Sequence, residues 1–224
     1  MKIQGVLFDM DGVILDTERA TRDIFIELSA RYGYTYPPDI YREVLGTNMR
    51  ETNETHRRIF GDAFPAQALL EETTVRLAAL AKAGALRYRK GFEECVAALR
   101  GSGVRMALAT STNRDLVEIY RTVYPVFRDA FDVTVCGMEV PQGKPKPDIY
   151  LLAARRLGLA PGACVGVEDS YYGLQSLRAA GAVSVMIPDL LPYTEAIAPQ
   201  VDYHLTDLTQ LCPLIRRLNA GQGE

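Results

Sequence analysis

The stretch Val6–Thr17 reads VLFDMDGVILDT, and it decides the predicted fold. A short apolar run ends abruptly at Asp9, and Asp11 and Gly12 follow directly. A buried strand of a parallel sheet has this pattern when it delivers a carboxylate to the carboxyl edge of the sheet, where ligands of open α/β sheets bind. Gly12 permits a backbone turn that a bulkier residue would resist.

Two carboxylates this close also predict charge compensation. Asp9 and Asp11 cannot both lie unpaired in a low-dielectric pocket, so either one of them is protonated or a cation lies between them. The structural alternative is a strand that ends in a turn, because Asp and Gly are ordinary turn residues. The stretch alone leaves both interpretations open.

Length and composition indicate an ordinary globular chain. Its 224 residues suit one large domain or a domain with an insertion. A net charge of −3 gives no reason to expect nucleic acid or an anionic membrane as partner. No apolar run approaches the length of a membrane span, and Asp9, Asp11 and Asp16 interrupt the only candidate signal peptide. We therefore expect a cytoplasmic protein.

Cysteines and histidines predict neither a disulfide framework nor a zinc site. The cysteines have no CxxC spacing and lie among apolar residues, which favours reduced core thiols. His56 and His204 are far apart in sequence and near no other candidate ligand. A zinc site or a histidine-based triad is therefore not expected. The four cysteines are Cys95, Cys136, Cys164 and Cys212.

Strands and helices alternate in the second part of the chain but not in the first. A strand at Ile3–Phe8 is followed by an all-helical stretch that lasts to about residue 89. Helices are predicted there at 17–32, 39–45, 49–60 and 66–84. Beyond it, strands at 104–109, 133–136, 164–167, 183–187 and 202–205 alternate with helices at 92–99, 114–123, 147–157, 171–180 and 208–218.

This order predicts an α/β fold with a doubly wound parallel, Rossmann-like sheet core and an inserted all-helical cap domain. Residues 1–15 and 90–224 would form the core, and residues 16–89 would form the cap.

Polar residues follow four of the predicted strands. Because the carboxyl ends of parallel strands meet at one edge of a sheet, we expect these residues to hold a phosphoryl group and a divalent cation. Taken singly, each has a structural alternative as a helix cap or a solvated loop lysine. Four such coincidences at successive strand ends are hard to attribute to capping. The residues are Asp9 and Asp11, then Thr110, then Lys144, and finally Glu168 and Asp169.

The motifs DMDGV, LATST, GKPKPD and GVEDS occur in this order and resemble the four motifs of the haloacid dehalogenase superfamily of phosphatases. The similarity extends over the whole chain and includes the position of the helical cap after the first motif. It is greatest to the branch that contains beta-phosphoglucomutase and small sugar-phosphate phosphatases.

The resemblance implies catalytic roles for two aspartates. Asp9 would be the nucleophile that forms an aspartyl-phosphate, and a carboxylate can do this at neutral pH because it needs no deprotonation. Asp11 would protonate the leaving oxygen and then activate water. Relatives that cleave carbon–halogen or carbon–phosphorus bonds keep no aspartate at this position, so Asp11 argues for phosphate-ester chemistry.

The resemblance also implies the binding groups. Thr110, the Ser111 N–H and Lys144 would bind the phosphoryl oxygens, whose charge is spread in the transition state. Gly12, Thr112 and Asn113 complete the predicted phosphate site. Magnesium would be held by Asp9, the Asp11 carbonyl and Asp169, with Glu168 as a further candidate ligand.

The cap is expected to select the substrate, because it closes over the edge of the core. The stretch 45–51, LGTNMRE, resembles the specificity loop of the family, in which Arg50 would reach a substrate oxygen or a distal phosphate. The structural alternative is Gly46 as a helix C-cap and Asn48 with Glu51 as a capping box. Thr21 stands where the mutase relatives have a histidine.

We therefore predict a monomeric, magnesium-dependent phosphatase of a small phosphorylated metabolite such as a sugar phosphate. The first alternative is a phosphosugar mutase, which the threonine at position 21 disfavours. The second is a receiver-type signalling domain that is phosphorylated on aspartate and catalyses nothing else. The cap insertion and the set of one lysine with several carboxylates argue against the receiver.

Overall fold

The computed structural model describes residues 2–47 and 49–221, and it confirms the predicted fold class. Within these residues the sheet has the strand order β3-β2-β1-β4-β5-β6, and all of its pairings are parallel. The chain order reverses around β1, so the carboxyl end of β1 is the switch point where ligands of such sheets bind. The strands are β1 (Gly5–Phe8), β2 (Arg105–Thr110), β3 (Val133–Cys136), β4 (Cys164–Glu168), β5 (Val183–Met186) and β6 (Tyr203–His204).

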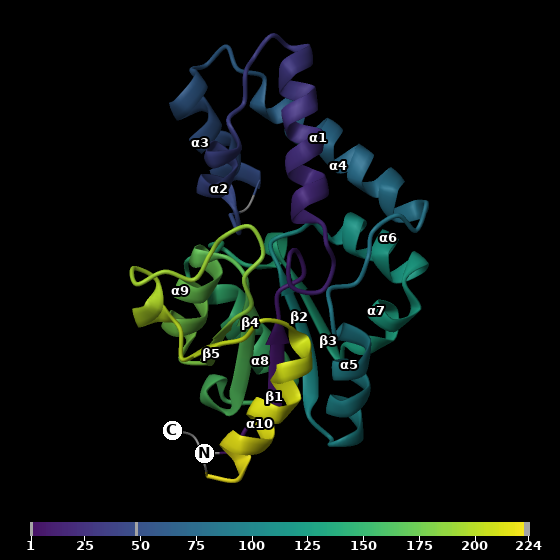
Figure 1. Cartoon of the computed structure of the whole chain (residues 1–224), viewed down its shortest axis with the longest axis vertical. Helices are drawn as coiled ribbons and strands as arrows, with labels where there is room; N and C mark the ends of the chain where they lie inside the picture. The colour runs from purple at the N-terminus through teal and green to yellow at the C-terminus, as the bar shows by residue number, and fades with distance from the viewer. Residues whose placement is uncertain (1, 48, 222–224) are drawn as a thin grey trace.

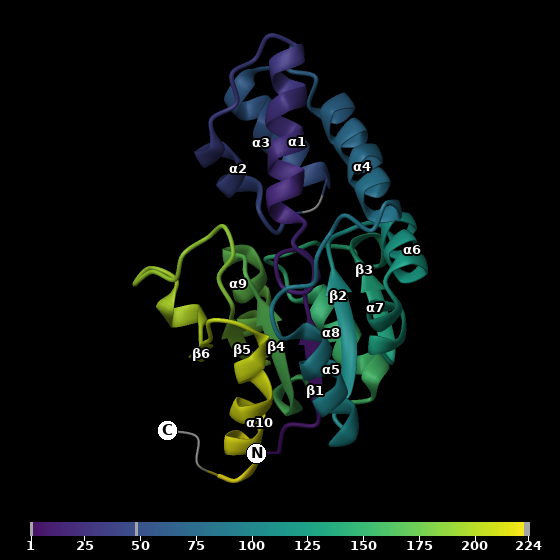
Figure 2. The ribbon, with the colours of Figure 1, turned by 45° about the vertical axis from the view of Figure 1, so that its right-hand side comes forward.

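Helices cover both faces of the sheet (Figures 1 and 2). Side chains of β1 alternate between the faces: Val6 and Phe8 pack into one hydrophobic cluster and Leu7 into the other. Strands buried on both sides read as continuous apolar runs, which is why the sequence pattern identified them. The first face carries α5 (Phe92–Gly101), α6 (Arg114–Val123), α7 (Pro125–Ala130) and α10 (Leu211–Asn219), and the second carries α8 (Asp148–Leu157) and α9 (Tyr171–Ala180).

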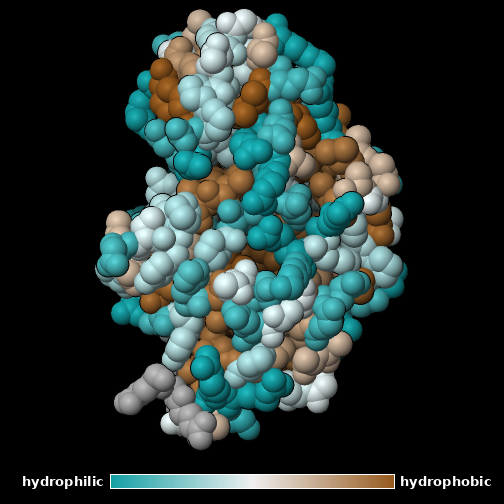
Figure 3. Space-filling view, in the orientation of Figure 1, coloured by the Kyte–Doolittle hydropathy of each residue, from teal (hydrophilic) through white to brown (hydrophobic). Residues whose placement is uncertain are grey.

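The remaining helices stand above the carboxyl ends of the strands (Figure 1). These cap helices are α1 (Glu18–Arg31), α2 (Pro38–Val44), α3 (Met49–Phe60) and α4 (Ala66–Lys82). They enclose a hydrophobic cluster of their own, which includes Phe25, Leu28 and Leu69. On the face drawn in Figure 3, the outline narrows where the cap helices meet the sheet body. The division of the chain at residues 16 and 89 stays a prediction.

The loop 188–193, which follows β5, reaches from the sheet body into the cap. Leu191 is buried in the cap cluster, and Leu190 packs against it. The buried carboxylate of Asp189 accepts hydrogen bonds from Arg19 of α1 and from Arg89, the latter at 2.9 Å. This loop therefore ties the first cap helix to the sheet body by both apolar and ionic contacts.

The chain enters and leaves the cap along two adjacent segments. Leu15 and Tyr88 form an isolated antiparallel bridge. The backbone N–H of Asp16 donates to the Arg87 carbonyl at 3.0 Å, and that of Arg89 donates to the Ile14 carbonyl at 2.8 Å. Movement of the cap relative to the sheet body would have to occur through this paired connection.

The structure differs from the predicted elements mainly at short segments. The helix α7 was not predicted, because its six residues begin at Pro125 and are too few to show a helical period. The last predicted helix divides into a 3₁₀ turn, Leu208–Gln210, and α10. The cysteines are free thiols, of which Cys212 is half-buried. No helix in the described ranges is long and apolar enough to cross a membrane.

Candidate active site

The loop after β1 brings Asp9 to the centre of the sheet edge. The Asp9 residue is 6% exposed, and its backbone N–H donates to the carbonyl of Val167 in β4 at 3.0 Å. Gly12 has a φ of +73°, and a Cβ at this position would collide with the carboxylate of Asp169. A glycine is therefore required both by the backbone conformation and by the close approach of the loop to Asp169.

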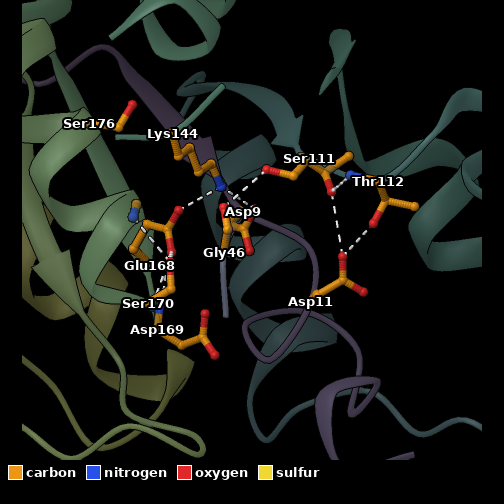
Figure 4. A network of polar contacts seen from close by, with 12 residues as sticks. Asp9, Asp11, Gly46, Ser111, Thr112, Lys144, Glu168, Asp169, Ser170 and Ser176 are labelled. Carbon is orange, nitrogen blue, oxygen red and sulfur yellow. Dashed lines mark hydrogen bonds and ion pairs between the residues drawn. The ribbon is translucent and has the colours of Figure 1, made fainter. Parts of the chain in front are cut away.

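Lys144 joins two carboxylates that come from different strands. Its Nζ lies 2.6 Å from Oδ1 of Asp9 and 2.6 Å from Oε1 of Glu168, and the lysine side chain is 1% exposed (Figure 4). Burial lowers the pKa of Lys144, but the two carboxylates raise it by more, so the ammonium form persists. Burial raises the pKa of Asp9, whereas the adjacent Lys144 ammonium lowers it and favours the carboxylate form.

Glu168 is surrounded by hydrogen-bond donors. Its Oε1 also accepts from the Tyr150 hydroxyl at 2.5 Å. Its Oε2 accepts from the backbone N–H groups of Asp169 and Ser170 at 3.2 Å each and from the Ser170 hydroxyl at 3.0 Å. Both oxygens of Glu168 are thus engaged, and this fixes the carboxylate that holds Lys144.

Three carboxylates form the candidate metal centre. Oxygen atoms of Asp9, Glu168 and Asp169 all lie within 4.8 Å of one another, and all three residues are buried. Burial and the negative charge of Glu18 raise the pKa of Asp169. In the described part of the chain, no donor is hydrogen-bonded to the Asp169 carboxylate. A hard divalent cation prefers such oxygen ligands, so this donor set fits magnesium, with Asp9 and Asp169 offering the free oxygens.

Asp11 points into a separate group of hydroxyls (Figure 4). Its carboxylate accepts hydrogen bonds from Thr17 at 2.6 Å and from Thr112 at 2.7 Å, while the Thr110 hydroxyl lies 3.5 Å away. Thr17 occupies the N-cap position of α1, but its hydroxyl bonds Asp11 instead of capping the helix. The Asp11 side chain does not belong to the three-carboxylate group, and the hydroxyls of Thr17 and Thr112 orient it.

Polar side chains at the end of β2 and in the loop after it form hydrogen bonds that stabilise the local backbone. The Thr110 hydroxyl accepts the backbone N–H of Thr112 at 3.0 Å. Oδ1 of Asn113 caps α6 by accepting the N–H of Leu116 at 2.9 Å. The cap of α6 is therefore Asn113, which also lines the cavity described below, so the capping alternative for Thr110 is wrong.

The cap loop docks directly on the site. The Ser111 hydroxyl donates to the Gly46 carbonyl at 3.3 Å. Gly46 has a φ of +79°, and a Cβ there would collide with the Ser170 hydroxyl. Arg50 lies close by on α3 with its side chain 80% exposed, 3.8 Å from Glu54. Asn48, one half of the predicted capping box, lies outside the described residues.

A cavity of about 510 Å³ lies between the sheet edge and the cap helices. The sheet body contributes most groups of the predicted site, but Gly12, Thr110 and Glu168 do not belong to the lining. The cap contributes a largely uncharged wall of hydroxyl and apolar side chains, with one carboxylate and one arginine. The lining includes Asp9, Asp11, Ser111, Thr112, Asn113, Lys144 and Asp169 from the body, and Glu18, Thr21, Phe25, Tyr41, Thr47, Arg50, Thr52, His56, Leu70, Thr73, Thr74 and Leu77 from the cap.

Glu18, Tyr41 and His56 also line the cavity, although the sequence did not indicate them as site residues. The Tyr41 hydroxyl donates to Oε2 of Glu18 at 2.8 Å, and burial together with Asp11 raises the pKa of Glu18 to about 8. An acidic residue in the first turn of a helix is usually explained by the helix dipole, so Glu18 gave no separate signal. His56 was set aside because it has no candidate partner nearby in sequence, yet it lines the cavity.

A family model and several known proteins match most of this chain. The family model of the haloacid dehalogenase-like hydrolases matches residues 3–181. The protein CbbY of Rhodobacter capsulatus is 36% identical over 197 residues, which are 84% of this chain and 86% of the relative. A phosphorylated carbohydrates phosphatase of Thermotoga maritima is 33% identical over 80% of this chain and 82% of its own.

The fold of this chain is also similar to that of a solved structure. The crystal structure of CbbY from Rhodobacter sphaeroides in complex with phosphate superimposes with a TM-score of 0.79 at 31% identity. The match covers 93% of this chain and 96% of that one.

The chain belongs to the haloacid dehalogenase-like hydrolases. Within that family it is a phosphatase, a hydrolase of phosphoric monoesters, of the branch with a helical cap.

Proposed function

We propose that this phosphatase depends on magnesium and releases phosphate from a small sugar phosphate through an aspartyl-phosphate on Asp9. The observation that carries the proposal is the position of the Asp9 carboxylate. It lies at the floor of the cavity, 2.6 Å from the Lys144 ammonium and in one group with Asp169. A buried carboxylate held in this way is preorganised to attack phosphorus.

In the first step, an Asp9 oxygen forms a bond to phosphorus while the bond from phosphorus to the ester oxygen breaks. Asp11 donates its proton to the leaving oxygen. In the second step, Asp11 takes a proton from water, the water oxygen bonds phosphorus, and the bond to Asp9 breaks. The hydroxyls of Thr17 and Thr112 hold the Asp11 carboxylate in place for both transfers.

The phosphoryl oxygens would be bound by Lys144, Thr110 and the Ser111 N–H. Asp9, Asp169 and the Asp11 carbonyl would hold the magnesium, which supplies positive charge against the phosphate when bound. We assign Glu168 chiefly to positioning Lys144, because both of its oxygens already accept hydrogen bonds.

The choice of a sugar phosphate is supported by the cap wall. A leaving group rich in hydroxyls matches a wall of threonine hydroxyls, Glu18 and Tyr41. The name of the Thermotoga maritima relative states that it acts on phosphorylated carbohydrates. Arg50, at the exposed rim, remains a candidate contact to a substrate oxygen.

A phosphosugar mutase remains the second candidate, since the same aspartates would serve it. Thr21 lines the cavity but has no titratable ring to control proton transfer. The ring of His56 lies in the cavity wall, but it is hydrogen-bonded to Tyr36 and burial lowers its pKa to about 4. Neither residue offers the proton control that a mutase would need, so we favour hydrolysis.

The proposal is tested by phosphate release from a panel of sugar phosphates and from para-nitrophenyl phosphate, with magnesium and with excess EDTA. We expect release that requires magnesium and that is restored when the chelator is titrated with magnesium. Full activity in EDTA would contradict the metal assignment. A chain that turns over no substrate in the panel would instead fit the receiver-type alternative.

We also expect a cytoplasmic monomer. The net charge of −3 offers no general attraction to nucleic acid or to an anionic membrane. The charge that binds the substrate is local, at Lys144.

A further inference from the structure

Two of the four cysteines lie against each other on the first face of the sheet. Cys95 belongs to α5 and Cys212 to α10, and the two helices are neighbours in both ribbon views (Figures 1 and 2). Their Sγ atoms are 3.8 Å apart, although 117 positions separate the residues in sequence. Sγ of Cys212 also lies 3.7 Å from the carbonyl oxygen of Cys95. The two sulfurs are therefore in contact in the folded chain.

Contacts of the segments that precede the two helices hold the pair in this position. The N–H of Leu208 donates to the carbonyl of Lys90 at 3.2 Å, and the Lys90 ammonium pairs with the Asp207 carboxylate at 2.8 Å. Gly91 approaches so closely that a Cβ on it would lie 2.6 Å from the backbone nitrogen of Thr209. Both cysteines follow these contacts by only a few residues, so the main chain determines how far apart they are.

The sulfurs need only a small movement to form a bond. A disulfide has its sulfur atoms about 2.05 Å apart, so the two Sγ atoms would have to approach by roughly 1.8 Å. Cys95 is buried, whereas Cys212 is half-buried and is the second residue of its helix. Rotation of the less enclosed Cys212 side chain about its χ1 angle can supply this movement without a change in the path of either helix.

The environment of the pair favours a thiolate on Cys212. The hydrogen bond with Cys95 lowers the pKa of the Cys212 thiol, and so does the positive charge of Arg216 one turn further along α10, although burial opposes both. The same hydrogen bond and burial raise the pKa of Cys95. The thiolate is the form of cysteine that attacks peroxides. Cys212 is therefore the attacking thiol, and Cys95 is the thiol placed to react with its product.

Cys164 provides a contrast within the same protein. It is buried at the start of β4, and its Sγ lies 3.6 Å from the carbonyl oxygen of Ala160. Burial raises the pKa of this thiol to about 11. A buried thiol of this kind is inert, so the reactivity of Cys212 does not extend to Cys164.

We propose that Cys95 and Cys212 are an oxidisable pair, which hydrogen peroxide converts into a disulfide that links the C-terminal helix α10 to α5. In the first step, the Cys212 sulfur attacks one peroxide oxygen, the O–O bond breaks, and a sulfenic acid and water form. In the second step, the Cys95 sulfur attacks the Cys212 sulfur, the S–O bond breaks, and the leaving hydroxide takes the Cys95 proton as water. The thiols lose two electrons and two protons in total, and one hydrogen peroxide becomes two water molecules.

The bond would stabilise the fold. It would close a loop that spans 117 positions of the chain and would restrict the unfolded state accordingly. We expect oxidation to raise the melting temperature by about 5–10 °C. Neither cysteine lines the cavity, so the proposal does not depend on the phosphatase reaction.

The test treats the folded wild type with a small excess of hydrogen peroxide, removes the oxidant, and compares it with untreated protein. Free thiols are counted after unfolding in urea, the linked peptides are identified by mass spectrometry, and the melting temperature is recorded. We expect the number of free thiols to fall from four to two and the linked peptides to contain Cys95 and Cys212. Dithiothreitol should restore the thiols and the original melting temperature.

Three variants separate the two steps. Cys212→Ser lacks the attacking thiol, so peroxide should leave its melting temperature unchanged. Cys95→Ala keeps the attacking thiol but lacks its partner, so a sulfenic acid on Cys212 should persist and react with dimedone. Cys164→Ala is the matched control, because it loses one thiol and keeps the pair, and its melting temperature should rise on oxidation as in the wild type. Circular dichroism reports on the fold of each variant.

Three results would overturn the proposal. One is that the treated wild type retains all four thiols, and another is a disulfide that joins other cysteines. The third is an equal rise in melting temperature in Cys212→Ser and in the wild type, which would place the effect of peroxide elsewhere in the chain.

Discussion

Nζ of Lys144 lies 2.6 Å from Oδ1 of Asp9, although 135 positions separate the two residues in sequence and both side chains are buried. The pair joins the loop after β3 to the end of β1, and Glu168 accepts from the same ammonium group. One buried cation thus serves two buried carboxylates.

Replacing Lys144 with Met should therefore impair both activity and stability. The variant would lose a ligand for the phosphoryl group and would leave two acids without their cation. Breaking a buried ion pair in this way lowers the free energy of unfolding by about 3–5 kcal/mol. Protonation of the two acids would reduce this loss. Phosphate release and urea unfolding measure the two effects. Lys146→Met is the control, because Lys146 is exposed, and both variants behaving alike would contradict the assignment.

Asp9→Asn should abolish turnover and preserve the fold. The amide has nearly the shape of the carboxylate but is a poor nucleophile. Circular dichroism and the melting temperature report on the fold, and steady-state phosphate release reports on turnover. Asp23→Asn, at an exposed position of α1, should behave like the wild type. Substantial remaining activity in Asp9→Asn would exclude covalent catalysis through this residue.

Hydrolysis should dominate over isomerisation for any hexose phosphate that the enzyme accepts. A mutase must protect its aspartyl-phosphate from water until the sugar is phosphorylated again, and Thr21 lacks a titratable ring for this control. The measurement supplies beta-glucose 1-phosphate with a trace of the bisphosphate and follows inorganic phosphate and glucose 6-phosphate together. The mutase assignment would be correct if glucose 6-phosphate formed much faster than phosphate.

The free energy of unfolding should depend on pH through His56. Burial lowers the pKa of this residue from 6.5 to about 4 in the folded protein. Between these values the unfolded chain binds the extra proton, so the contribution of His56 is complete above pH 6.5 and decreases as the pH falls towards 4. The full effect is on the order of 3 kcal/mol.

Urea unfolding of the wild type and of His56→Gln, at neutral pH and near pH 4.5, tests this expectation. The other titrating groups are common to both proteins, so the difference between them isolates His56. The wild type should lose more stability on acidification than the variant. Parallel losses would show that the histidine titrates normally in the folded state.

The part of the site that lies on the sheet body was predictable, because the end of each strand can be recognised in the sequence and all of these ends lie at one edge of the sheet. Asp9, Lys144 and Asp169 follow strands and Thr110 is the last residue of one, and parallel strands bring their carboxyl ends to one edge. The hydrogen bonds from Tyr150 to Glu168 and from Thr17 to Asp11 were not predictable. They depend on how a helix and a loop are placed against the sheet, which no local pattern specifies.

The cap was predictable only as a set of helices. Helical periodicity identifies the stripe that packs inward, but Glu18 and His56 line the cavity because of how α1 and α3 are rotated about their axes. That rotation follows from packing between cap helices. The role of Arg50 stays a prediction, because its side chain is mostly exposed and forms an ion pair with Glu54 of the same helix.

The loop 188–193 has a consequence for attempts to exchange specificity between relatives. The cap helices can be removed from the sequence as one insertion, but Leu191 is 5% exposed only because it is packed in their cluster. A cap taken from a relative would have to pack against Leu190 and Leu191, with which it did not evolve. Asp189 would also lose its ion pair with Arg19 unless the donor helix carries an arginine at that position. A chimaera should therefore take both the cap helices and the segment that corresponds to loop 188–193 from the same donor protein.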